Sequence, residues 1–289
     1  MVEKYVPKLG NLNVQWSFPL QFEKANLDKS SLASTPIEYY DYEGAKLQQH
    51  ATGIFIKHAG QVYLVTARHA LSGTDVFTDA SISPTGYRPK TIAVYPTYLG
   101  KDGLHRCNHE PTKLSVRDND DQPLWFEDPL FDELRTDIAC LKMDDKSAAE
   151  IEAISSEVGG NIFSHVGMSC FVIGFPSSAY FRPFLPIWRR ASFASELRFP
   201  IDDKPIFLVD ANTSPGMSGS AIWQYSYGPK VLHDGRSGFK VELDAVIGAK
   251  FVGIYGGRLA TPDEMGPIGY GWYANRIPVI IESQCLGRG

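Results

Sequence analysis

The sequence of 289 residues lacks any long apolar run and any block of like charge. No stretch approaches the roughly 20 apolar residues that a membrane-spanning helix needs. The amino-terminal residues show no basic start followed by an apolar segment, so no secretory signal is expected. The net charge is -5, and the one basic cluster is Arg189-Arg190. Because phosphate binding needs clustered cations, neither a membrane nor a nucleic-acid partner is expected.

Cysteine is scarce, and the spacings that hold metals are missing. Cys140 and Cys170 fall within apolar strand-like runs, far from Cys107 and Cys285. Free buried thiols are therefore predicted, which favours a reducing, cytoplasmic compartment.

No His-Glu-x-x-His motif and no paired cysteines occur. His105 and His109 stand at helical spacing with Cys107 between them, but their neighbours are typical of a solvated loop. No metal site and no cofactor are expected.

The composition that remains is that of a turn-dense β protein. Hydrophobic residues make up 43% of the chain, with 26 Gly, 19 Pro, 14 Tyr and 16 Phe. This length and composition allow a large core in one unit or two, built mainly of strands.

A serine stands on a small-residue turn between two apolar segments. Residues 214–220 (SPGMSGS) follow the apolar run 207–209 and precede the apolar run 221–223. Glycines on both sides let the backbone approach a substrate carbonyl closely, and the amides of Gly216 and Ser218 can face a developing oxyanion. The same residues also suit an ordinary turn, so the motif by itself leaves both interpretations open.

Two upstream segments supply the partners that a serine nucleophile needs. A serine hydroxyl requires a base to take its proton and a third group to orient that base. The apolar run 63–65 leads through a small-residue turn to His69, and Asp137 leads directly into the apolar run 138–141. Each residue alone is also typical of a turn or a strand start. Together, in the order histidine, aspartate, serine, they favour catalysis.

At these motifs the chain resembles the chymotrypsin-like (trypsin-fold) serine peptidases, whose catalytic residues follow that order. The resemblance rests on residues 66–69 (TARH), 137–139 (DIA) and 215–219 (PGMSG), and it covers about residues 50 to 280. Weaker similarities to the strands of the second barrel in that family are residues 172–176 (VIGFP), 252–257 (VGIYGG) and 271–274 (GWYA).

The resemblance implies an all-β fold of two six-stranded antiparallel β-barrels with the catalytic cleft between them. It predicts an amino-terminal arm over 1–39, a first barrel over 40–145, a linker helix over 146–160 and a second barrel over 161–289. The activity it implies is that of a serine endopeptidase acting on peptides or proteins.

The resemblance also assigns roles to single residues. Ser218 attacks the peptide carbonyl, His69 transfers the proton, and Asp137 orients the imidazole. The amides of Gly216 and Ser218 hold the oxyanion. The implied substrate-binding residues are Asn212, Thr213, Ser214, Tyr255, Gly256, Gly257 and Gly271.

Two of these positions bear on specificity and activation. No acid stands at Asn212, the implied base of the pocket, and a buried substrate cation would lack a counter-charge there. Glutamate-selective members of the family carry a histidine where this chain has Ile254 and Tyr255, so an uncharged residue before the scissile bond is expected. Met217 replaces the aspartate that pairs with a newly cut amino terminus in secreted members. Amino-terminal trimming is therefore not the expected switch, and the oxyanion loop is either preformed or ordered by a ligand or a regulatory protein partner.

Two alternative functions stay open, and a third is disfavoured. An α/β-hydrolase needs Gly-x-Ser-x-Gly with its histidine downstream, but residue 220 is serine and the only later histidine, His233, lies in a polar loop. A catalytically silent peptide-binding or interaction protein of the same fold is the main alternative, although a complete triad argues against it. An esterase that uses the same triad is the second.

The rest of the chain can be divided by pattern. Alternating apolar and polar residues over 12–22 predict a half-buried edge strand, followed by a linker over 23–38. The polar residues 98–134 predict an inserted loop beside the active site, and Ser147 opens a capping box for a short helix. No further domain is expected after the last strand. Other strands are predicted at 53–56, 62–65 and about 162–175, 185–197, 205–211, 219–226, 239–255 and 269–280.

Overall fold

The computed structural model describes most of the chain. No helix in the described part is long and apolar enough to cross a membrane. Of the edge strand expected over 12–22, residues 12–19 lie outside the described part of the chain, and Leu20–Glu23 form strand β1. The described residues are 20–23, 27–40, 46–107, 110–156, 162–176, 185–227, 230–233, 239–242, 247–259 and 268–288.

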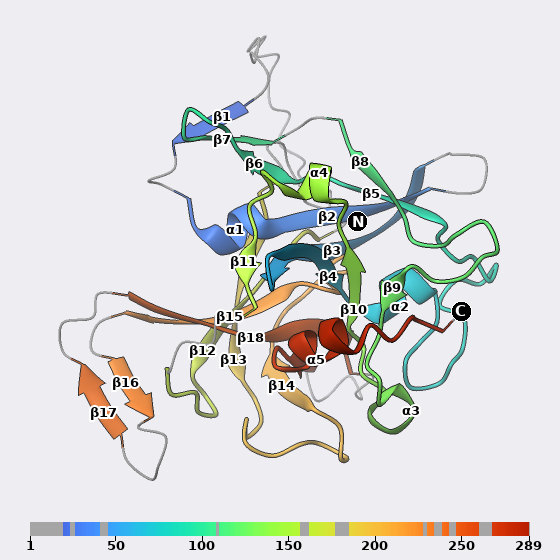
Figure 1. Ribbon diagram of the computed structural model, residues 1–289. Helices are drawn as coiled ribbons and strands as arrows, with labels where there is room; N and C mark the ends of the chain where they lie inside the picture. The colour runs from blue at the N-terminus through green and yellow to red at the C-terminus, as the bar shows by residue number, and fades with distance from the viewer. Residues whose placement is uncertain are drawn as a thin grey trace, which may run out of the picture.

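An eight-stranded sheet forms the first half of the molecule and lies in the upper part of Figure 1. Its strand order is β8-β5-β2-β3-β4-β10-β9, and β11 pairs with β3 in parallel outside this path. The strands expected at 53–56 and 62–65 are confirmed within β3 and β4. The bounds are β2 Ser34–Tyr40, β3 Lys46–His58, β4 Gln61–Thr66, β5 Thr91–Val94, β8 Thr112–Ser115, β9 Trp125–Phe126, β10 Ala139–Lys142 and β11 Ile154–Ser155.

The second half is a closed antiparallel barrel of six strands in the order β12-β13-β14-β19-β18-β15, as expected for the second barrel. A two-stranded hairpin, β16 Lys230–His233 and β17 Phe239–Glu242, belongs to neither half. The barrel strands are β12 Ser169–Gly174, β13 Ile187–Phe193, β14 Ile206–Asp210, β15 Ala221–Tyr227, β18 Ile247–Arg258 and β19 Ile268–Tyr273.

The expectation of a six-stranded antiparallel barrel in the first half is wrong. Among the described residues this half is a curled sheet with eight strands and one parallel pair. The cause lies in the length of β3. Its first part pairs with β2, whereas Ile56, near its other end, pairs with Ile154 of β11. The segment that connects the two halves therefore pairs with the end of β3 that β2 leaves open.

The expectation of a polar loop over 98–134 is also wrong. β6 Thr97–Leu99 and β7 Leu104–Cys107 form a three-stranded sheet with β1, and β8 and β9 belong to the large sheet. In β7 the side chains of His105 and Cys107 are buried, and the His105 ring contacts Glu152 at 3.0 Å. A buried histidine and cysteine on one face thus give this polar segment the alternation of a strand. His109 lies outside the described residues.

The last strand was expected to run to residue 280, but β19 ends at Tyr273 and a helix begins at Arg276. The isoleucines at 277, 280 and 281 are the buried residues of this helix, α5 Arg276–Ser283. They recur at the three-to-four-residue spacing of a helix face. Their β-branched side chains are equally typical of a strand, which explains the error.

The other helices are short, and two of them correct the expected boundaries. Residues 27–40, expected as linker and arm, contain a helix and all of β2. The expected linker helix begins at Asp145, so Ser147 lies inside it and does not cap it. These helices are α1 Lys29–Ala33, α2 Arg68–Ser72, α3 Phe131–Leu134 and α4 Asp145–Ala148.

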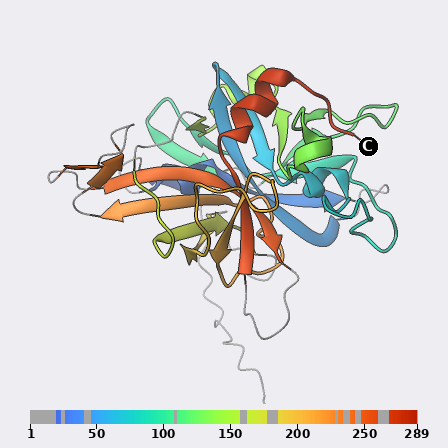
Figure 2. The same ribbon diagram turned by 90° about the horizontal axis from the view of Figure 1, so that it is seen from below.

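The two halves share one hydrophobic cluster. It joins Ile54 and Val65 of the sheet to Ile173 and Trp272 of the barrel, and α5 packs into it. In Figure 2 the chain after α5 runs back along the sheet, where Glu127 N donates to the carbonyl of Cys285 at 2.9 Å. The carboxyl-terminal segment therefore crosses the junction between the halves.

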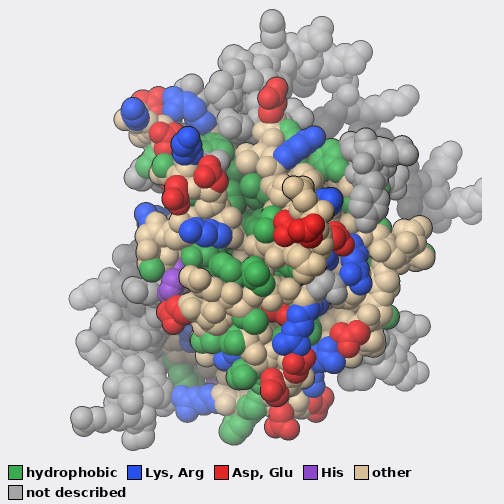
Figure 3. Space-filling model, turned by 45° about the vertical axis from the view of Figure 1, so that its right-hand side comes forward, with side chains coloured by type: hydrophobic (Ala, Val, Ile, Leu, Met, Phe, Trp, Pro, Cys, Tyr) green, Lys and Arg blue, Asp and Glu red, His purple; other side chains and the backbone are tan. Residues whose placement is uncertain are grey.

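The cysteines agree with the prediction of free thiols. In the described part of the chain Cys107, Cys140, Cys170 and Cys285 form no disulfide, and the first three are buried. On the face seen in Figure 3, Lys and Arg side chains are interspersed with Asp and Glu side chains, so this face shows no large patch of like charge.

Candidate active site

His69 lies in the first turn of α2, directly after the buried strand β4. Its neighbour Arg68 points the other way and is buried, where its Nε donates to Glu127 at 2.7 Å and its guanidinium lies 4.1 Å from the Phe131 ring centre. Adjacent residues of a helix face different directions. The buried Arg68–Glu127 pair therefore fixes α2 from behind, while the His69 side chain stays 20% exposed.

Asp137 is brought to His69 by strand register. β10 pairs with β4 so that Ala139 faces Thr66, and extending this register past the strand ends places Asp137 beside the start of α2. The fully buried carboxylate accepts from His69 Nδ1 at 2.7 Å and from the His69 backbone amide at 2.8 Å. Both carboxylate oxygens are thus committed to one residue, which fixes the ring orientation.

The electrostatics of this pair set the basicity of the imidazole. Burial, the largest single influence, lowers the pKa of His69, whereas the charge of Asp137 and its hydrogen bond raise it. The charge of Asp75 raises the pKa further, and Arg68 opposes it. The net result is a pKa above the ordinary 6.5, so the ring is a stronger base than a free histidine.

Ser218 lies in the loop between β14 and β15, which the sequence motif indicated. Gly216 and Gly219 adopt positive φ angles of 93° and 84° in this loop. A Cβ on Gly219 would come within 2.1 Å of the Thr52 carbonyl oxygen. Glycine is therefore required there by both backbone conformation and space.

Thr52 of β3 docks the serine loop onto the first sheet. Its amide donates to the carbonyl of Ser218 at 2.8 Å, and its hydroxyl donates to the carbonyl of Gly216 at 2.9 Å. The same hydroxyl accepts from the amide of Phe175, at the end of β12, at 2.9 Å. One buried threonine thus ties the sheet, the barrel and the serine loop together, and nothing in the sequence pattern singled it out.

His69 and Ser218 line the same cavity. Its volume is about 300 Å³, and it lies between elements of the first sheet and the serine loop. The other lining residues are Tyr39, His50, Ala51, Ala70, Gly73, Ile82, Ser83, Tyr87, Pro89, Pro215 and Gly216.

The amides around the serine are distributed unevenly. Gly219 N donates to the Tyr255 carbonyl at 2.8 Å, and Met217 N donates to the Ser214 carbonyl at 3.2 Å. Within the described part of the chain, the amides of Gly216 and Ser218 donate to no protein acceptor. These two donors were assigned to the oxyanion from the sequence. Met217 between them is fully buried in the barrel core.

The structure brings together two of the residues expected to bind substrate and adds a third. The hydroxyls of Thr213 and Tyr255 lie 2.7 Å apart, and Arg258 Nε donates to Thr213 at 3.4 Å. Both hydroxyl-bearing residues are buried, whereas Arg258 is exposed at the end of β18. The sequence analysis did not place Arg258 in this group.

The other expected substrate-binding residues have different surroundings. A Cβ on Gly271 would meet Ile222 and Phe207 of the barrel core, whereas a Cβ on Gly269 would lie 2.6 Å from the Tyr255 ring. Gly256 and Gly257 lie against Tyr270, and Asn212 is exposed with Ser214 half-buried. Gly271 is the strand partner of Tyr255, and Gly269 is the glycine covered by the Tyr255 ring.

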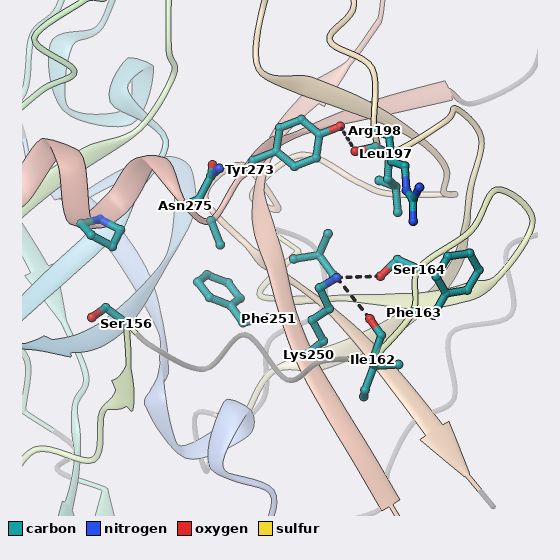
Figure 4. Close-up of a pocket in the computed structure, with 13 residues that line it drawn as sticks. Ser156, Ile162, Phe163, Ser164, Leu197, Arg198, Lys250, Phe251, Tyr273 and Asn275 are labelled. Atoms are coloured by element: carbon teal, nitrogen blue, oxygen red, sulfur yellow. Dashed lines mark hydrogen bonds between the residues drawn. The ribbon is translucent and has the colours of Figure 1, made fainter. Parts of the chain in front are cut away.

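A larger pocket, of about 640 Å³, lies elsewhere on the barrel and shares no lining residue with the His69–Ser218 cavity. Figure 4 shows Lys250 reaching between apolar side chains to donate to the carbonyl of Ile162 at 3.3 Å and to Ser164 at 3.0 Å. Burial lowers the pKa of Lys250. The histidine and serine that the sequence motifs indicated, His69 and Ser218, line the smaller cavity, so pocket size alone does not identify the candidate active site. In the described part of the chain no cluster of three or more metal-ligating side chains occurs.

A closed barrel packed on a curled sheet, with a carboxylate-bound histidine and a loop serine on one cavity, defines a serine hydrolase of the trypsin-like type. The model of the trypsin-like peptidase domain matches residues 51–229, so the chain belongs to this family and is a serine protease.

The solved structures that the chain resembles include proteases at low sequence identity. The active form of the Rv3671c protease from M. tuberculosis is 13% identical, with a TM-score of 0.48, over 90% of this chain and 83% of that one. The HtrA-type protease AlgW bound to a tripeptide is 17% identical, with a TM-score of 0.45, over 89% of this chain and 60% of that one. The thermostable serine protease AL20 from an extremophilic microorganism is 11% identical, with a TM-score of 0.47, over 89% and 99%. A search of curated proteins found no matching sequence.

Proposed function

We propose that the chain is a serine endopeptidase in which Ser218, His69 and Asp137 form the catalytic triad. The observation that carries the proposal is the pair of hydrogen bonds, 2.7 and 2.8 Å, from His69 to the buried Asp137. They leave the other ring nitrogen, Nε2, available, and Ser218 lines the same cavity.

In the first half of the reaction, His69 Nε2 takes the proton from Ser218 as its oxygen attacks the peptide carbonyl carbon. The resulting imidazolium is stabilised by Asp137 and then gives its proton to the leaving amine as the C–N bond breaks. Water, deprotonated by the same nitrogen, attacks the acyl-enzyme and releases the acid product. The two unpaired amides of Gly216 and Ser218 hold the carbonyl oxygen as its charge develops.

Met217 bears on how the proposed activity is switched on. Its apolar, fully buried side chain offers no carboxylate to a new amino terminus, and Thr52 already holds the Gly216 and Ser218 carbonyls. The oxyanion loop is therefore preformed or ordered by substrate or by a regulatory protein. Removing a few amino-terminal residues should leave kcat unchanged, and a gain in activity with the new amine buried near Met217 would contradict this.

Peptide turnover by wild type and by Ser218→Ala tests the proposal. The wild-type chain should cleave internal peptide bonds, and the variant should lose turnover by about four to six orders of magnitude. A catalytically silent peptide binder would show no turnover in either form and equal peptide affinity in both.

The esterase alternative is separated by substrate. Matched amide and ester substrates with the same acyl part should both be hydrolysed by an endopeptidase. If the ester were hydrolysed but no member of a diverse peptide library were cleaved, the site would be assigned to ester hydrolysis.

A further inference from the structure

Three polar side chains converge beside the serine loop. Thr213 precedes Ser218 by five residues, Tyr255 lies on β18, and Arg258 ends that strand. The Thr213 hydroxyl is within hydrogen-bonding distance of both the Tyr255 hydroxyl, at 2.7 Å, and Arg258 Nε, at 3.4 Å. Two hydroxyl groups and a guanidinium group are therefore in contact with one another.

The distance of this group from the nucleophile suits a substrate side chain. The amide of Gly219 and the carbonyl of Ser220 hydrogen-bond to the Tyr255 backbone, each at 2.8 Å, so Tyr255 is anchored next to Ser218. Arg258 lies three strand residues further, or about 10 Å at the usual rise per residue. A substrate residue whose carbonyl is at Ser218 and the long side chain of Arg258 can together span this distance.

The charge of this group lacks an internal partner. Arg258 is exposed, and in the part of the chain that the structure describes its guanidinium meets no carboxylate. Burial raises the pKa of Tyr255, against the opposing effects of Thr213 and Arg258, so its hydroxyl stays protonated at neutral pH. A planar guanidinium beside hydroxyl donors is the arrangement that binds carboxylates.

We propose that Arg258, with Thr213 and Tyr255, selects a Glu or Asp residue on the amino-terminal side of the scissile bond. The inference rests on the proposed function and names its substrate class. It replaces the expectation of an uncharged residue, which considered Asn212, Ile254 and Tyr255 but not the arginine that follows Gly257.

Paired fluorogenic peptides that differ only in Glu or Gln before the cleaved bond test the inference. The ratio of kcat/KM for Glu over Gln should be at least about tenfold in wild type, as expected for a hydrogen bond between charged groups. Arg258→Gln should bring this ratio close to one, and Arg258→Lys should keep part of it. Arg198→Gln, at the distant Lys250 pocket, is the matched control and should leave the ratio unchanged.

Ionic strength supplies an independent readout. Because Arg258 is exposed, raising salt from about 0.1 M to about 1 M shortens the Debye length from about 10 Å to about 3 Å and should lower the Glu over Gln ratio. Equal cleavage of both peptides, or a preference that Arg258→Gln leaves in place, would overturn the inference while the proposed function stands. Absence of Ser218-dependent cleavage of any peptide would overturn both.

Discussion

The first sheet and the second barrel hold the residues of the proposed triad in different ways. His69 follows β4 and Asp137 precedes β10, and these two strands pair with each other. The two side chains are hydrogen-bonded directly, so the sheet itself sets their geometry. Ser218 sits on a loop with glycines at positive φ, and its position depends on Thr52 from the opposite half. The acid–base pair is thus local to one half, whereas the nucleophile is placed by the junction between halves.

The largest expected effect comes from breaking the acid–base pair within the sheet. Asp137→Asn keeps the shape of the side chain but removes the charge that favours the correct ring tautomer. We expect kcat to fall about 10⁴-fold, which is the loss that an Asp-to-Asn change causes in a Ser-His-Asp triad of a chymotrypsin-like peptidase. Steady-state kinetics measure it, with circular dichroism to show that the fold persists. A loss below tenfold would show that Asp137 is not the orienting group.

Gly219→Ala tests how the serine loop depends on the junction. The added Cβ would meet the Thr52 carbonyl at 2.1 Å, with φ at 84°. Gly60→Ala, in the turn between β3 and β4, is the matched control because its φ is 86° and nothing lies within 4 Å. The control should cost about 1 kcal/mol of unfolding free energy from backbone conformation, and Gly219→Ala should cost a further 1–3 kcal/mol from overpacking, with severe loss of activity. Equal stabilities by urea denaturation would contradict the docking described above.

Thr52→Val removes the hydroxyl that joins the Gly216 carbonyl to the Phe175 amide. Leaving a buried amide unpaired should cost about 1–3 kcal/mol. Thr35→Val is the control, since the Thr35 hydroxyl accepts from the buried Tyr95 amide at 2.8 Å without touching the serine loop. Both variants should lose similar stability, but only Thr52→Val should lower kcat, by roughly tenfold. Equal kcat in the two variants would contradict the role of Thr52.

The pH dependence of kcat/KM is the smallest expected effect, and it depends on His69 and Asp137, which both lie in the first half. His69 must be neutral to act as a base, and its raised pKa should place the acid limb of kcat/KM above pH 6.5. The same shift stabilises the folded chain when His69 is protonated. That contribution is fully present below the unfolded pKa and is lost as pH rises through the folded pKa. An acid limb below pH 6.5 would show that burial outweighs Asp137.

The three residues proposed as the triad could be selected from the sequence because each lies where an apolar strand meets a small-residue turn or a strand start. It did not predict the strands between 97 and 126, since strands of two to four residues are too short to show a reliable alternation. It also missed Thr52 and Arg68, whose roles arise from partners 59 to 164 residues away.

The substrate pocket was harder to predict for a geometric reason. The pairing of β18 with β19 shifts register between Tyr255 and Gly257. An inserted residue reverses which side chains face which side beyond that point. The bulge explains how Arg258, three residues after Tyr255, reaches the same Thr213 hydroxyl as Tyr255, which strict alternation along β18 would not predict.

Labelling with a fluorophosphonate probe, followed by mass spectrometry, tests the central claim most directly. A serine activated by His69 should be labelled at Ser218 alone, and His69→Ala should abolish labelling while the fold, checked by circular dichroism, remains. Labelling at another serine, or labelling of Ser218 that persists in His69→Ala, would contradict the account.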